Sequence, residues 1–143
     1  MIMILLSLFF ALAVFVAAFA YFILGALWYS PLLFVKPWME GNKIPPPTEE
    51  DKQKMKKQMM PLMLTTLVCC FGATAILGCI EALTGAHSIA IGIKTGLAAS
   101  VFTTVTLALN SMYLRKPFKL FVIDSAYHAC GLVIAGIILA MWA

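Results

Sequence analysis

The chain has 143 residues, of which 63% are hydrophobic and only 11% are charged. A soluble globular domain carries about twice that fraction of charged residues, so water is not the main solvent of this chain. The formal net charge of +4 comes from basic residues at the ends of apolar runs, without a recognised nucleic-acid-binding motif, so we expect a lipid bilayer and no nucleic acid as partner.

Four apolar runs are each about as long as the ~20 residues that a helix needs to cross the ~30 Å hydrocarbon core of a bilayer. They lack the strict alternation that is typical of barrel strands, and a helix satisfies its own backbone hydrogen bonds in lipid. The sequence therefore predicts an all-α membrane protein with a single domain of four transmembrane helices. The predicted spans are residues 3–27, 60–83, 91–112 and 120–142.

The first apolar run resembles a secretory signal peptide at one point, because Ala18-Phe19-Ala20 looks like a cleavage site. It has no basic residues ahead of the apolar stretch, which a signal peptide normally has. We therefore expect it to be a retained helix.

The segment between the first two predicted helices, residues 28–59, begins with aromatic residues and prolines that favour the headgroup layer of the membrane. Further on, Thr48 followed by Asp51 is typical of a helix start. The lysines after it attract anionic lipid at roughly 1 kcal/mol each. This segment is therefore expected to be a solvated face anchored to lipid, with a docking surface for a cytoplasmic partner as the alternative.

The basic residues predict the orientation of the chain. All of them except Lys94 fall in residues 28–59 or 113–119, which lie on the same side of the membrane. By the positive-inside rule this side is cytoplasmic, so both termini are expected outside. In a bacterium the membrane would be the cytoplasmic membrane.

Small and polar residues recur at three- and four-residue steps in the predicted helices, which places them on one face of each helix. In the third predicted helix they are Gly92, Gly96, Ala99, Thr103, Thr106 and Asn110. Small residues let membrane helices approach closely, and hydroxyl and amide groups hydrogen-bond between them. These faces are expected to form the bundle interior or the interface of a homo-oligomer.

Ionisable side chains within a membrane span are candidates for function, because their burial in lipid is costly. Glu81 and Lys94 lie near the outer ends of the second and third predicted helices, which a short loop joins. We expect them to form a structural ion pair at the outer interface.

Asp124 and His128 lie one turn apart in the fourth predicted helix, and Asn110 is expected at the same depth. An aspartate that accepts a hydrogen bond from a histidine favours the protonated ring, so this pair can carry or sense a proton. In the alternative interpretation, Asp124 pairs with Arg115 or Lys116. His128 is then hydrogen-bonded only to a threonine of the third helix or to Asn110.

No enzyme motif accompanies these residues: the chain has no nucleophile elbow, no H-E-x-x-H sequence and no glycine-rich phosphate loop. Its four cysteines fall inside the predicted spans without metal-ligand spacing. We therefore expect no catalytic activity, no cofactor and no metal.

Two stretches resemble a family of small membrane proteins catalogued as domain of unknown function 1761. One contains Trp28, Tyr29, Ser30, Pro31, Phe34 and Trp38, and the other runs from Lys119 to Ile123 and continues with Ala126 and Tyr127. Val35 and Asp124 differ from the residues we would expect in that family, glycine and asparagine. The resemblance covers essentially the whole chain and implies four helices. It implies nothing about activity, because the family has none assigned.

Two functional classes agree with these observations. In the first, the protein is a small oligomeric transporter or channel-like protein for an ion or small solute, in which Thr103, Thr106, Asn110 and the Asp124–His128 pair line a path. In the second, it is a scaffold or accessory subunit that transports nothing and binds a membrane-protein partner.

Overall fold

The computed structural model describes residues 2–45, 47–85 and 88–142, and over these ranges the chain is helical without strands. Its five helices are α1 (Ile2–Trp28), α2 (Val35–Gly41), α3 (Glu49–Thr84), α4 (Ile89–Tyr113) and α5 (Phe118–Trp142). All except α2 are long and apolar enough to cross a membrane, as predicted. The short helix α2 is an addition: it lies in the segment for which the sequence predicted only an interfacial position.

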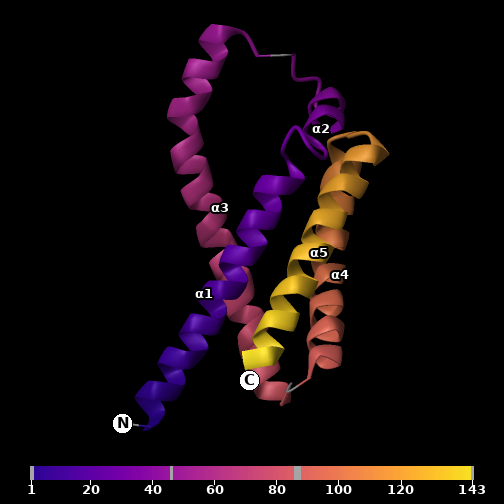
Figure 1. Cartoon of the computed structure of the whole chain (residues 1–143). Helices are drawn as coiled ribbons and strands as arrows, with labels where there is room; N and C mark the ends of the chain where they lie inside the picture. Colours follow the sequence, from indigo (N-terminus) through magenta and orange to yellow (C-terminus); the bar gives the residue numbers. More distant parts are fainter. Residues whose placement is uncertain (1, 46, 86–87, 143) are drawn as a thin grey trace.

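The ends of the long helices gather at two opposite ends of the molecule (Figure 1). The start of α1 and the end of α5 lie at the end where α3 passes into α4. Helix α2 and the turn between α4 and α5 lie at the other end. This arrangement is the one expected for four successive crossings, which place both termini on the same side.

Helix α5 is central, since it contacts each of the other four helices. Its closest neighbour is α4, and the two backbones touch where Gly92 faces Gly136: a Cβ atom built on Gly92 would lie 2.4 Å from the Gly136 carbonyl oxygen. Gly96 packs in the same way on Leu132. The small residues in the first half of α4 therefore allow this helix to pack closely against α5.

Helix α3 starts where the sequence predicted a helix start. The Thr48 side chain accepts a hydrogen bond from the Asp51 backbone amide, and the Asp51 side chain accepts one from the Thr48 amide, which is a capping box. The helix then continues through Pro61 without a break and ends at Thr84, where Gly85 caps it with a left-handed φ of 67°. The polar extension and the membrane span are thus one helix of 36 residues.

The first half of α3 diverges from the other long helices (Figure 1). Its buried residues begin only at Cys70, whereas Met59, Met60, Leu62 and Leu64 are exposed. This half of the helix therefore presents an apolar surface that no other helix of the chain covers.

Candidate functional site

Asp124 and His128 both hydrogen-bond to tyrosines that belong to α1 or follow it. The Tyr29 hydroxyl donates to Asp124 Oδ1 at 2.8 Å, and the Tyr21 hydroxyl lies 2.5 Å from His128 Nδ1. Within the described ranges Asp124 and His128 form no hydrogen bond with each other. The structure thus brings both predicted residues to one interface, α1 against α5, through partners that the sequence did not indicate.

The alternative ion pair of Asp124 and the alternative hydrogen bond to Asn110 are not formed either. Asp124 makes no ion pair with Arg115 or Lys116 in the described part of the chain, where the only ion pairs join neighbouring residues of α3. The side chain of Asn110 is exposed and makes no hydrogen bond with a described residue. Asn110 therefore hydrogen-bonds to neither Asp124 nor His128.

Aromatic packing holds the α1–α5 interface together. Tyr127 lies between the two hydrogen bonds, with its ring centroid 5.4 Å from that of Tyr21 and 5.4 Å from that of Tyr29. Tyr21 is only 3% exposed, so its hydroxyl needs a partner within the protein, and His128 supplies it. Three tyrosines therefore fix the positions of the two ionisable groups.

Two glycines make room for these rings. A Cβ atom on Gly131 would lie 2.0 Å from a ring carbon of Tyr21, and one on Gly25 would lie 2.8 Å from the Tyr127 hydroxyl. Real Cβ atoms essentially never approach other atoms so closely. The glycines of this interface therefore let tyrosine side chains of α1 and α5 pack against the backbone of the other helix.

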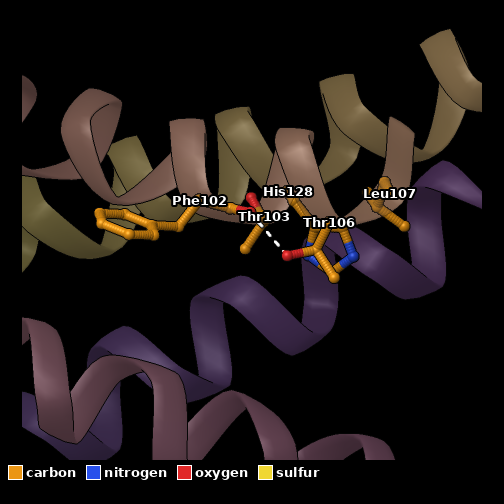
Figure 2. Close-up of a pocket in the computed structure, with 5 residues that line it drawn as sticks. All are labelled: Phe102, Thr103, Thr106, Leu107 and His128. Carbon is orange, nitrogen blue, oxygen red and sulfur yellow. Dashed lines mark hydrogen bonds between the residues drawn. The ribbon is translucent and has the colours of Figure 1, made fainter. Parts of the chain in front are cut away.

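His128 also borders an open cavity of about 320 Å³. The cavity is lined by Phe102, Thr103, Thr106, Leu107 and His128. In Figure 2 the Thr106 side chain and the His128 ring project from the helices α4 and α5 toward the ribbon of α1. The structure therefore brings together three of the residues that the sequence predicted to share a path, and leaves Asn110 and Asp124 outside the lining.

The threonine hydroxyls of the cavity use their protons within α4. Thr106 donates to the Phe102 carbonyl at 2.9 Å, and Thr103 donates to the Ser100 carbonyl at 2.8 Å. A hydroxyl oxygen that has donated its proton still has lone pairs that accept hydrogen bonds. The lining therefore offers two acceptors beside a titratable ring.

The contact with Tyr21 suits both protonation states of His128. A neutral ring with its proton on Nε2 accepts the Tyr21 hydroxyl proton at Nδ1, whereas an imidazolium donates from Nδ1 to the same hydroxyl oxygen. No described residue hydrogen-bonds to Nε2. This ring can therefore gain and lose a proton at Nε2 while it keeps its partner.

The aromatic motif that follows the first span is fastened to α5. The Trp28 indole donates to the Ile123 carbonyl at 3.1 Å, and its ring packs on Phe34 with a centroid distance of 4.9 Å. Tyr29 packs on Trp38 at 5.8 Å. Burial, and then the bond to Asp124, raise the pKa of Tyr29 above its ordinary value.

Two small residues shape the turn within this motif. The Ser30 hydroxyl donates to the Leu27 carbonyl and accepts from the Leu32 amide, while Pro31 is exposed. Ser30 and Pro31 thus form a turn that directs the chain toward α2, while Trp28 and Tyr29 bind α5.

Glu81 and Lys94 do not form the predicted ion pair. Both belong to the described part of the chain, where the Glu81 carboxyl group hydrogen-bonds to the Thr95 hydroxyl and is 2% exposed, whereas Lys94 is exposed. Lys94 and Thr95 are adjacent in α4 and point in different directions, and only Thr95 turns toward α3. The carboxyl group therefore lies inside the bundle and away from the lysine.

Sequence reasoning missed Tyr21, Tyr127 and Thr95 as parts of these sites. The one available signal was the position of the tyrosines, since a hydroxyl in the middle of an apolar helix needs a partner. No local pattern indicated which residue that partner would be.

A known family matches most of the chain. A family described as "Protein of unknown function (DUF1761)" matches residues 12–140. The chain belongs to this family. The DUF1761 match begins in α1 and ends in α5, so it includes the aromatic motif, Asp124 and His128, and it confirms the resemblance seen in the sequence. Neither the curated proteins nor the solved structures contain a match.

Proposed function

We propose that this protein is a small membrane transporter or channel-like protein for an ion or small solute, and that the His128 cavity is part of its path. A titratable ring that lines an open cavity together with two threonines carries the proposal. The proposal includes no catalytic step and no cofactor.

The depth of the cavity supports this function. His128 lies about 15 Å along the helix axis from the start of α5 at Phe118, and Thr103 lies about as far from the end of α4 at Tyr113. Half of a ~30 Å hydrocarbon core is also about 15 Å, so both residues lie close to the membrane midplane. Solute sites of secondary transporters are typically found at that depth.

The position of the cavity favours an oligomer. All of its lining residues come from α4 and α5, and Phe102 and Thr106 are exposed at its edge. Four helices leave little room for a pore inside one protomer, so a second copy placed against this side would complete the path. The polar stripe of α4 would then face the interface between protomers.

Flux measurements in liposomes test the proposal. Purified protein should move an ion or small solute, screened with pH- and ion-sensitive dyes, and His128→Ala and Asp124→Asn should abolish that flux. Cys130→Ala is the matched control, because Cys130 is exposed on α5 and does not line the cavity. Flux equal to that of the wild type in folded His128→Ala protein would refute the role of the cavity.

The orientation inferred from the basic residues completes the proposal: both termini are outside, and residues 28–59 and 113–119 face the cytoplasm. Single cysteines placed at exposed positions near Lys54, Leu114 and Met141, in a chain without its own cysteines, would report the side. The first two should react with a membrane-impermeant reagent only in inside-out vesicles, and the third only in intact cells.

A scaffold or accessory subunit is the second candidate, and the uncovered half of α3 favours it. Exposed methionines form adaptable apolar surfaces, and Met59 and Met60 continue such a surface toward the lysine-rich first turns of the helix. A stoichiometric membrane-protein partner recovered in mild detergent would support this function. A homo-oligomer without other subunits would favour transport.

A further inference from the structure

Glu81 is the most deeply buried ionisable side chain outside the His128 cavity. It is 2% exposed and lies in α3, three residues before that helix ends at Thr84. At a rise of ~1.5 Å per residue this places it about 4.5 Å from the helix end, at the end of the bundle where α1 begins and α5 ends (Figure 1).

The carboxyl group of Glu81 sits against the tightest crossing in the bundle. A Cβ atom on Gly136 would lie 3.2 Å from Glu81 Oε1 and 2.3 Å from the Gly92 carbonyl oxygen. Larger residues at either glycine would separate α4 from α5 and fill the space beside the carboxyl group. The two glycines therefore both join these helices and leave room for the carboxyl group.

The hydrogen bonds around this group do not suit a carboxylate. Oε1 lies 2.5 Å from the Thr95 hydroxyl, and Oε2 is buried without a hydrogen-bond partner in the described ranges. The Thr95 hydroxyl has one proton, yet the carbonyl oxygens of Ile91 and Gly92 also lie within its reach, at 3.2 and 3.0 Å. A carboxylate would have to compete for that single proton and would otherwise have no donor.

A protonated Glu81 resolves the competition. The carboxylic acid donates its proton to the Thr95 oxygen, and Thr95 donates its own proton to a carbonyl of α4. Every polar hydrogen in the cluster then has an acceptor.

No cation compensates a charge on Glu81 within the described residues. On α4 the nearest basic residue is Lys94, which is exposed and forms no ion pair with it. The stretches of the neighbouring helices at this end, residues 8–20 of α1 and 131–142 of α5, contain no ionisable side chain. An unpaired carboxylate inside the bundle would be costly, which favours the neutral acid.

We propose that Glu81 and Thr95 form a buried proton-binding site at the α3–α4–α5 junction. This site is separate from the His128 cavity and does not depend on the proposed transport function. Its ligand is a proton held between the carboxyl group and the Thr95 hydroxyl, near the end of the bundle that carries both termini.

Carbon-13 NMR of the wild-type protein in lipid nanodiscs tests the proposal directly. The chain has four glutamates, Glu40, Glu49, Glu50 and Glu81, and the first three are exposed. With glutamate labelled at its carboxyl carbon, one of four signals should show the chemical shift of a protonated acid at neutral pH, and three should show carboxylates. Single Glu→Gln variants at the three exposed positions should each remove a carboxylate signal and leave the protonated one, which assigns it without altering the buried site.

Two results would overturn the proposal. Four carboxylate signals at neutral pH would show that Glu81 is ionised. A protonated signal that becomes a carboxylate when sodium or lithium replaces potassium at constant pH would show a site for a small cation. An unchanged protonated signal in all three salts supports the proton as the ligand.

Discussion

The hydroxyl of Tyr29, in the turn after α1, donates a 2.8 Å hydrogen bond to Asp124 on α5, 95 residues further along the chain. Tyr29→Phe removes this hydroxyl and keeps the ring, so we expect a loss of about 1 kcal/mol in the free energy of unfolding, as is typical of one hydrogen bond. Unfolding in mixed detergent micelles measures the loss. Tyr113→Phe, in a side chain that is 87% exposed, should have no effect, and an equal loss in both variants would contradict the prediction.

The same phenol predicts a dependence of stability on pH. The pKa of Tyr29 is raised in the folded protein, so the neutral phenol stabilises the fold. This contribution is complete below the ordinary tyrosine pKa of ~10 and is lost as the pH rises above it, because the unfolded chain then releases the proton more readily. The unfolding midpoint of the wild type should therefore fall more steeply above that pH than the midpoint of Tyr29→Phe. Parallel curves for the two proteins would show that Tyr29 titrates normally.

Gly131→Ala should disturb the contact between Tyr21 and His128. The added methyl group would lie 2.0 Å from a carbon of the buried Tyr21 ring, so the ring or the helix must move, at a cost of about 1–3 kcal/mol. The unfolding midpoint should fall, and the NMR signals of the His128 ring should shift. Gly72→Ala is the matched control, since a Cβ atom there meets no atom within 4 Å. Equal stability of the two variants would contradict the close contact between Gly131 and the Tyr21 ring.

Thr48→Ala should loosen the first turn of α3. The variant loses the hydroxyl that accepts from the Asp51 amide and donates to the Asp51 carboxylate. That second bond, together with one from the Thr48 amide, which the variant keeps, holds the pKa of Asp51 below its ordinary value. The pKa of Asp51, followed by NMR, should rise toward that of a free aspartate. The amides of the first turn should exchange with solvent about five times faster, the factor that corresponds to a cap of ~1 kcal/mol. Thr65→Ala, whose hydroxyl bonds only to the Pro61 carbonyl, should change neither quantity.

Part of the candidate site could be read from the sequence. Asp124 and His128 stood out because ionisable groups in an apolar helix are rare, and Thr103 and Thr106 because they share one helical face. The structure places His128 and both threonines at one cavity. Asn110 shares that face and yet does not line the cavity, because the helical period indicates which residues point the same way and not where along the helix a cavity lies.

The ion pair predicted between Glu81 and Lys94 was wrong for a related reason. Sequence proximity across a short loop placed the two residues near each other, but a helix turns by about 100° per residue, so Thr95 faces Glu81 while Lys94 faces outward. A difference of one position along α4 thus decided between a surface ion pair and a buried carboxyl group beside Thr95.

The sequence alone determined that this protein is a set of membrane-length helices, where α3 begins and which residues are small enough for close packing. These properties are local, since a helix in lipid satisfies its backbone hydrogen bonds within its own segment. Only the tertiary structure decided that Tyr21 meets His128, that Tyr29 meets Asp124 and that Glu81 lies beside Thr95. Such contacts depend on which helices are neighbours and on their rotation about their axes, and the packing of side chains across the whole bundle sets both.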